Sequence, residues 1–250
     1  MSGKSAKLDR APIIEAVLDL DCDMPPALDL GTLEVAARDA FRERYPKFRT
    51  QFLQEHTIQA PAEGSPSLSV RRGLQAFQFL QDDELQLVQV RAAGFSFNRL
   101  APYTSLDDYL PEIERAWRVF VGLASPLQVR QIRLRYINRI LLPLVEGQVD
   151  LDKYLAIGPR LPEERTLTFV GFLHRHAAAE KRTGNRVNTT LASQPPEENR
   201  LPVILDIEAA ADASIDPRDW PSLDARIQSL RSLKNLVFRR TLTKRCLKLF

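Results

Sequence analysis

Three arginines in one central stretch are the residues of this sequence best suited to binding chemistry. In Leu127–Pro143, apolar residues alternate with Arg133, Arg135 and Arg139, which is the period of two expected of a strand. Arg133 and Arg135 would project from one sheet face about 6–7 Å apart. A guanidinium fork matches both phosphate and carboxylate groups. The stripe is therefore either an anion-binding surface or one half of a ladder of internal ion pairs. The acidic strand residues available for pairing are Glu15, Asp19, Asp206 and Glu208.

The other face of the same strand carries one polar residue among apolar ones. Asn138 lies between Tyr136 and Ile140 on that face. A buried amide needs hydrogen-bond partners. We expect Asn138 to bind a loop or the backbone of a neighbouring strand.

The C-terminal segment is the second basic feature. No acidic residue follows Asp224, and the candidate binding cations there are Arg239, Arg240, Lys244 and Arg245. Leucine and isoleucine residues recur among them at helical spacing. A basic amphipathic helix of this kind either contacts nucleic acid, anionic lipid or an acidic partner, or is a core helix with a solvated cationic face.

Other site chemistries find little support. His174 and His176 share a strand face but lack a further ligand in sequence, and Cys22 and Cys246 show no paired spacing. No Gly-rich phosphate loop and no nucleophile elbow occurs. We assign no catalytic residue, metal or cofactor, and the sequence favours a protein without enzymatic activity.

Bulk properties set wider limits. A chain of 250 residues with 44% hydrophobic residues can bury a sizeable core, and its net charge of +3 does not demand a polyanionic partner. The N-terminal apolar run is broken by Glu15 and Asp19, unlike a signal peptide. No stretch approaches the roughly 18 apolar residues of a membrane span. These properties predict a cytoplasmic protein without a membrane span.

Periodicity predicts two similar halves that must position these residues. Residues 1–10 form a flexible leader, residues 11–125 a first α+β half, and residues 126–250 a second. The first half is predicted to contain a strand at 11–20, a helix at 30–45, extended runs at 52–60, 67–80 and 85–99, and a helix at 106–123. The run at 85–99 is expected to carry a bulge at Gly94, where the alternation shifts. Asp29 and Ser105 are the expected helix caps.

The second half repeats the order of elements. It is predicted to contain the central strand, a short helix near 151–157, extended runs at 167–176, 186–191 and 201–210, and a helix from Asp219 to about Arg240. We therefore expect an α+β fold of two pseudo-repeated strand–helix–three strands–helix units. They form antiparallel curved sheets, or one continuous sheet, with the helices on one face. A single continuous domain without duplication is the alternative.

Three stretches carry a resemblance to a known family. They are APIIEAVLDL at 11–20, LRYINRILLP at 134–143 and LKNLVFRRTLTKRCLKLF at 233–250. Together they resemble a sporadically distributed family of uncharacterised bacterial proteins. Its members show an Ala-Pro-x-x-Glu-Ala start with Glu15, an Arg-Tyr-x-Asn-Arg-Ile strand, and a C-terminal helix holding Phe238 and a nearby Thr. The resemblance implies no activity or catalytic residue. The patchy distribution resembles that of defence or mobile-element genes.

We therefore expect a binding or adaptor protein of the bacterial cytoplasm. In the leading hypothesis a protein partner, or a second copy of the chain, lies across a sheet face. The first alternative is nucleic-acid binding through the arginine stripe and the basic C-terminal helix. The second is a small-anion binder or enzyme with a pocket between the halves.

Overall fold

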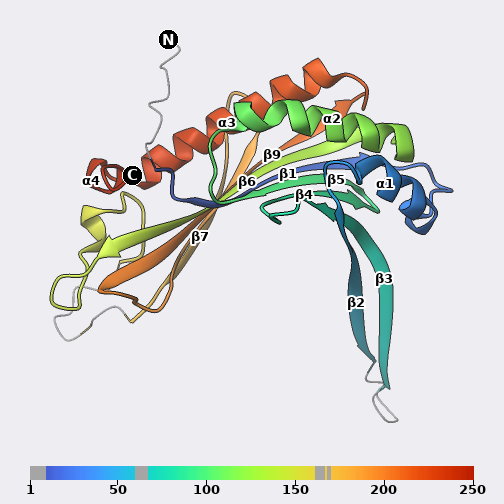
Figure 1. Ribbon diagram of the computed structural model, residues 1–250. Helices are drawn as coiled ribbons and strands as arrows, with labels where there is room; N and C mark the ends of the chain where they lie inside the picture. Colours follow the sequence, from blue (N-terminus) through green and yellow to red (C-terminus); the bar gives the residue numbers. More distant parts are fainter. Residues whose placement is uncertain (1–9, 60–66, 161–166, 168–169) are drawn as a thin grey trace.

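One antiparallel sheet forms the frame of the protein (Figure 1). The computed structural model describes residues 10–59, 67–160, 167 and 170–250, with side chains described throughout these ranges except at 54–59 and 67–72. Nine strands are hydrogen-bonded in the order β2-β3-β4-β5-β1-β6-β9-β8-β7. The strands are β1 (Ile13–Asp23), β2 (Lys47–Gln59), β3 (Ser67–Leu80), β4 (Gln86–Arg91), β5 (Gly94–Leu100), β6 (Gln128–Pro143), β7 (Leu173–Ala179), β8 (Arg186–Ser193) and β9 (Arg200–Ile215).

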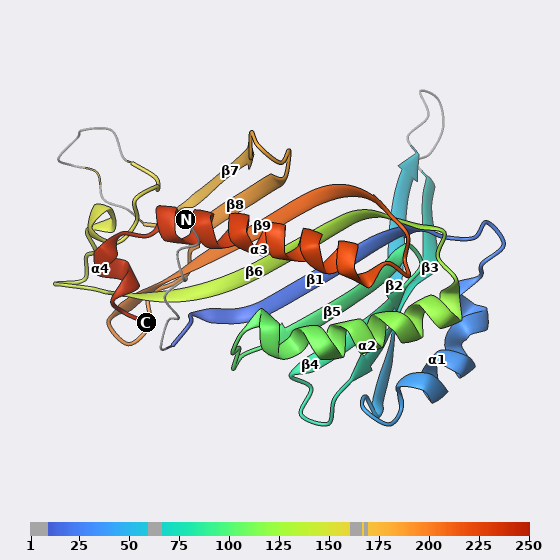
Figure 2. The ribbon, with the colours of Figure 1, turned by 90° about the horizontal axis from the view of Figure 1, so that it is seen from above.

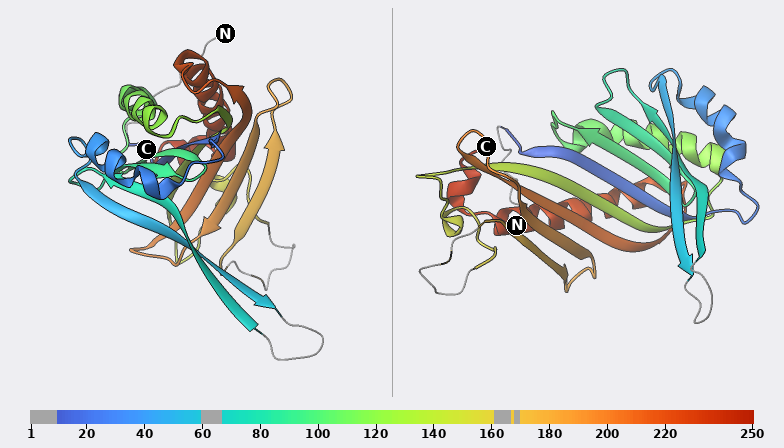
Figure 3. Two further views of the ribbon diagram at one scale, coloured as in Figure 1. Left: turned by 90° about the vertical axis from the view of Figure 1, so that its right-hand side faces the viewer. Right: turned by 90° about the horizontal axis from the view of Figure 1, so that it is seen from below.

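The longer helices lie on one face of this sheet. The helices are α1 (Glu34–Phe41), α2 (Leu106–Ala124), α3 (Trp220–Thr241) and α4 (Lys244–Leu247), with 3-10 turns η1 (Leu30–Leu33) and η2 (Leu151–Lys153). Seen from above, α1, α2 and α3 all lie in front of the strands (Figure 2). From below, the strands lie in front of the helices, and the sheet curves away from α2 and α3 (Figure 3). The α+β class, the continuous curved antiparallel sheet and the one-sided helices are thereby confirmed.

The core lies between the sheet and α2 and α3. Along β1 and β6 every second side chain is buried, including Leu18, Leu20 and Leu134. Trp117 of α2 covers this layer, and its ring centroid lies 5.6 Å from that of Phe95 on β5. Period-two burial on one face is what the strand patterns predict. The intervening charged residues therefore lie on the open face.

Local capping signals place the helix starts correctly. The Asp29 side chain accepts a hydrogen bond from the Gly31 N–H at the start of η1. Ser105 and Asp219 likewise accept hydrogen bonds from the third residue after them, at the starts of α2 and α3. Such caps satisfy N–H groups that have no intrahelical acceptor.

Three predicted segments are corrected. The run at 85–99 is not one strand with a bulge but the hairpin β4–β5, whose turn is formed by Ala92 and Ala93. The helix predicted near 151–157 is a single 3-10 turn, because only Leu151–Lys153 adopts it. The strand predicted to begin at residue 167 begins at Leu173. The first half therefore has four strands between its helices rather than three.

The two predicted halves meet at the centre of the sheet. β1 and β6, the first strands of each half, pair antiparallel, and each is flanked by the last strand of its own half, β5 or β9. This order is what a duplicated unit would give, and duplication stays a prediction. The predicted leader lies, except for Arg10, outside the described residues. Within the described part of the chain, each helix is too short or too polar to span a bilayer.

Candidate functional site

The arginine stripe on β6 is engaged in ion pairs. Nη1 of Arg133 lies 2.6 Å from a carboxylate oxygen of Asp21 on β1. Arg135 binds Asp206 on β9 through two parallel hydrogen bonds of 2.9 and 2.6 Å. Arg139 lies 2.5 Å from Glu197. The sequence leaves two arrangements open, an anion-binding surface and a ladder of internal ion pairs, and the structure shows the ion pairs.

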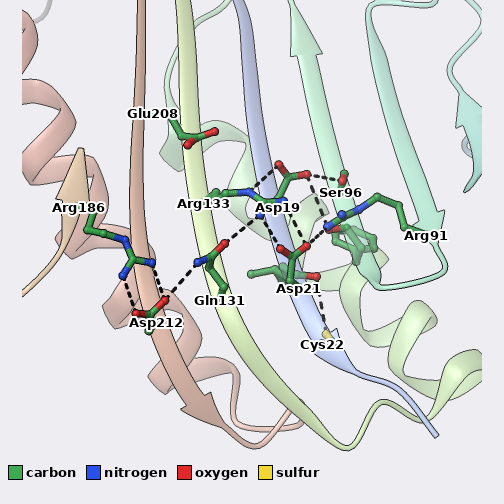
Figure 4. Close-up of polar contacts among 12 residues, drawn as sticks. Asp19, Asp21, Cys22, Arg91, Ser96, Gln131, Arg133, Arg186, Glu208 and Asp212 are labelled. Atoms are coloured by element: carbon green, nitrogen blue, oxygen red, sulfur yellow. Dashed lines mark hydrogen bonds and ion pairs between the residues drawn. The ribbon is translucent and has the colours of Figure 1, made fainter. Parts of the chain in front are cut away.

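The Arg133–Asp21 pair belongs to a ladder across the open face (Figure 4). The ladder joins β8, β9, β6, β1 and β4 through Arg186, Asp212, Gln131, Arg133, Asp21 and Arg91. Asp19 joins it by accepting a hydrogen bond from Ser96 and by lying 3.6 Å from Arg133. The hydrogen bond from Arg186 lowers the pKa of Asp212 to about 2. Three arginines and three aspartates cancel in charge, so this part of the face does not present a cationic surface.

The candidate cations of the C-terminus are exposed. Arg239, Arg240, Lys244 and Arg245 all lie at the surface, while α3 buries Leu223, Ile227 and Leu230 against the sheet. The guanidinium of Arg245 lies 5.5 Å from the centroid of the Tyr154 ring. The segment is thus a core helix with a cationic outer face.

The two histidines of β7 contact one another, with ring nitrogens 3.3 Å apart. Burial, followed by the neighbouring His174, lowers the pKa of His176. In the residues described, no group of three or more histidine, cysteine or acidic side chains is placed to hold a metal ion. Glu15, the polar residue of the first motif, accepts a hydrogen bond of 2.9 Å from Asn98 on β5.

A cavity of about 580 Å³ lies where the two halves meet, on the helical side of the sheet. It is bounded by the start of β1, the N-terminus of α2, β6 and the second half of α3. Its lining includes Ala11, Pro12, Tyr103, Ser105, Leu106, Asp107, Tyr136, Asn138, Arg231, Lys234, Phe238 and Arg239. Volumes of this size are typical of small-molecule sites. Residues from each of the three stretches that carry the family resemblance line this one cavity.

Asn138 fixes the floor of the cavity. Its side chain is buried and donates hydrogen bonds to the carbonyl oxygens of Leu205, at 2.9 Å, and Tyr136, at 3.3 Å. The prediction that this amide binds a neighbouring backbone is confirmed. This contact joins β6 to β9 two residues from Tyr136, whose side chain lines the same cavity.

Lys234 is the unusual residue of the cavity. It is only 8% exposed, and its Nζ lies 3.7 Å from the centroid of the Tyr136 ring. Among the described residues no carboxylate forms an ion pair with it. Burial, and then the nearby Arg231, lower the pKa of Lys234 to about 7, while the ring face acts in the opposite direction by stabilising the ammonium.

A second cation is present but neutralised. Arg231 binds Asp107, in the first turn of α2, through hydrogen bonds of 2.6 and 2.8 Å. This contact lowers the pKa of Asp107 and fastens α3 to the N-terminus of α2. The first N–H groups of a helix have no intrahelical acceptor and carry a partial positive charge. Asp107 and Asp108 in the first turn of α2 offset part of this charge, and Lys234 adds a positive charge to the cavity wall.

Two phenols add a hydrogen-bond donor. The hydroxyl oxygens of Tyr103 and Tyr136 lie 2.8 Å apart. Since only one of two paired hydroxyls donates to the other, the acceptor keeps its own O–H for another partner. Burial raises the pKa of Tyr103 and raises that of Tyr136 to about 12. Both phenols therefore stay protonated near neutral pH.

The sequence indicates Tyr136, Asn138 and Phe238 as motif residues and offers a pocket between the halves as an alternative, but it does not indicate that these residues line that pocket. The sequence does contain one indication that Lys234 is buried. Buried positions recur along α3 at Leu223, Ile227, Leu230, Lys234, Phe238 and Thr241. A lysine within such a stripe is expected to be buried. Tyr103 and Asp107 gave no signal, because only the tertiary fold brings the start of α2 beside α3.

Comparison with known proteins gives no relative from which to assign a role. No model of a protein family matches the chain, and no protein with a curated description matches it. A functional assignment therefore depends on the geometry of the cavity and of the open sheet face.

Proposed function

We propose that this protein binds a small organic anion in the cavity between its two halves. The observation that carries the proposal is Lys234, a lysine nine-tenths buried in the cavity wall without a carboxylate partner. Burying an ammonium group without a counter-charge is unfavourable. A bound anion would supply that charge.

The rest of the cavity supports an anion of metabolite size. The N-terminus of α2 favours a negative group, as helix N-termini generally do. The free hydroxyl of the Tyr103–Tyr136 pair can donate to a further oxygen atom. Because the charge of Arg231 is balanced by Asp107 and Arg239 is exposed to solvent, the buried Lys234 is the group expected to distinguish an anion from a neutral ligand.

Thermal unfolding of the full chain with acetate, pyruvate, citrate, inorganic phosphate and AMP tests this proposal. At a ligand concentration of about a hundredfold over Kd we expect stabilisation of about 2.7 kcal/mol, a rise of roughly 5–10 °C in Tm. Lys234→Met should abolish the shift. The matched control is Lys181→Met, which removes an exposed lysine from the turn between β7 and β8 and should preserve the shift.

A Tm that does not respond to any of these anions would overturn the proposal. So would an equal response in Lys234→Met and in the unaltered protein, because binding would then occur elsewhere.

The open sheet face is a second candidate site, for a protein partner or a second copy of the chain. It is favoured by the curvature of the sheet and the absence of α1, α2 and α3 from that side (Figure 3). A partner there would meet polar side chains whose charges are largely balanced in ion pairs.

Nucleic-acid binding has less support, since Arg133, Arg135 and Arg139 are each paired with a carboxylate. We expect no retention of the protein on immobilised DNA or RNA at physiological salt. Retention that falls steeply with added salt and is lost in an Arg240→Gln, Lys244→Gln, Arg245→Gln triple variant would instead favour nucleic acid as the ligand.

The biological setting belongs to the same proposal. The motifs at 11–20, 134–143 and 233–250 support membership of the sporadically distributed bacterial family that they resemble. Through that resemblance we place the protein in the bacterial cytoplasm, in a defence or mobile-element system. Capture of its ligand from a native host lysate would connect the cavity to that setting.

A further inference from the structure

The Lys234 side chain has the features of a nucleophile as well as of a counter-ion. An amine attacks a carbonyl carbon only in its neutral form, because an ammonium has no free electron pair. Surface lysines in ion pairs stay charged, whereas Lys234 is buried in the cavity wall and, among the residues described, has no carboxylate beside it to stabilise the ammonium. With its pKa lowered to about 7 by burial, a substantial fraction is neutral near physiological pH.

The groups around the amine suit such a reaction. Protonated phenols, Tyr103 and Tyr136, lie on one side, and the Tyr136 ring contacts Nζ directly. The other charged groups of the cavity are Arg231 and the exposed Arg239, which lie on α3 with Lys234, and Asp107 of α2, which pairs with Arg231. In the described part of the chain no carboxylate other than the paired Asp107 lines this cavity, so no free acid competes with a bound anion.

We propose that Lys234 forms an imine with the carbonyl carbon of an oxo acid bound in this cavity. The proposal rests on the anion-binding function proposed above and names its ligand class: a small molecule with a carboxylate beside an aldehyde or ketone. The carboxylate lies toward the N-terminus of α2, and the carbonyl lies toward Nζ and the phenol pair.

The reaction balances without any further reagent. The electron pair of the neutral Nζ forms a bond to the carbonyl carbon, and the carbonyl oxygen takes one proton from solvent to become a hydroxyl. The nitrogen loses one proton, the C–O bond breaks, and the hydroxyl leaves with that proton as water. The product is a protonated imine, and no atom is oxidised or reduced. The free phenol O–H donates a hydrogen bond to the oxygen as it becomes the leaving group.

Borohydride reduction followed by mass spectrometry of the intact full-length chain tests the proposal. Reduction converts an imine into a stable secondary amine, which appears as one covalent adduct. We expect an adduct with pyruvate and with glyoxylate, little with acetaldehyde, which lacks the carboxylate, and none with lactate, which lacks the carbonyl. Peptide mapping should place the adduct on Lys234.

Two variants separate the chemistry from binding. Lys234→Met should lose the adduct, whereas Lys181→Met should retain it. Lys234→Arg keeps a positive charge but has no amine able to form an imine, so it should retain a thermal shift with lactate and lose the adduct. The adduct yield of the unaltered protein should rise with pH through about 7, as Lys234 loses its proton.

The outcomes distinguish the two proposals. A thermal shift with pyruvate and lactate but no adduct overturns imine formation and leaves anion binding intact. If neither a thermal shift nor an adduct is observed, both proposals are overturned. An adduct spread over several surface lysines, unchanged in Lys234→Met, also overturns the imine proposal.

Discussion

Replacing Lys234 with methionine is expected to raise the free energy of unfolding at pH 7 by about 2–3 kcal/mol, even though it should abolish the anion binding that we propose. The pKa of this lysine falls from 10.5 to about 7 on burial. At about 1.4 kcal/mol per pKa unit, the folded state is destabilised by roughly 4 kcal/mol at neutral pH. The Tyr136 ring offsets about 1–2 kcal/mol of this. Methionine fills a similar volume without a charge to desolvate.

The pH dependence of this gain has a definite sign. The pKa of Lys234 is lower in the folded than in the unfolded chain, so between about pH 7 and pH 10.5 the unfolded chain binds more protons. Stability of the unaltered protein should therefore rise with pH across this window. The advantage of Lys234→Met should be largest at and below pH 7 and should vanish near pH 10.5. Urea unfolding at several pH values measures both effects.

The control for this prediction is again Lys181→Met, which should change stability by less than about 0.5 kcal/mol at any pH in the window. If Lys234→Met were less stable than the unaltered protein, the lysine would have a structural role. A gain that did not depend on pH would mean that burial of the charge is not its cause. A residue that binds ligand at a cost in stability is common at functional sites.

Much of the fold is predictable because its signals are local. The caps at Asp29, Ser105 and Asp219 act within three residues of each helix start, and the alternation along β1 and β6 follows from one buried and one open sheet face. These patterns predict the α+β class and the alternation of buried and open side chains along β6. The sequence also placed the arginines of β6 on a shared face, but it left open whether they are paired.

The unpredicted features depend on distant residues. The Asp212–Gln131–Arg133 part of the ladder needs the register of β6 against β9. The cavity needs α2 and α3 to lie on the same side of that pair. For a different reason, the sequence does not indicate the β4–β5 hairpin. Ala92 and Ala93 are poor turn residues by composition, so the shift in alternation at Gly94 predicts a bulge and not the first residue of a new strand.

Gly94 should be among the least replaceable positions of the chain, and Gly94→Ala is expected to destabilise it by more than about 4 kcal/mol. Two effects add. Its φ of +142° is rarely adopted by residues with a side chain. A Cβ there would also lie 2.1 Å from the Leu20 carbonyl oxygen on β1. That oxygen belongs to the backbone of a central strand, so relief requires moving β5 away from β1.

Gly184→Ala is the matched control, because it isolates the backbone effect. Gly184 has a φ of +73°, but a Cβ there would meet nothing within 4 Å. Strain without a clash should cost about 1–2 kcal/mol. Urea unfolding compares the two variants. If Gly94→Ala does not accumulate as folded protein, the comparison uses the soluble yield and the far-ultraviolet circular dichroism of both variants in place of urea unfolding. Equal losses in the two would show that β1 and β5 can separate at this point, contrary to the tight pairing of Asp21 with Gly94.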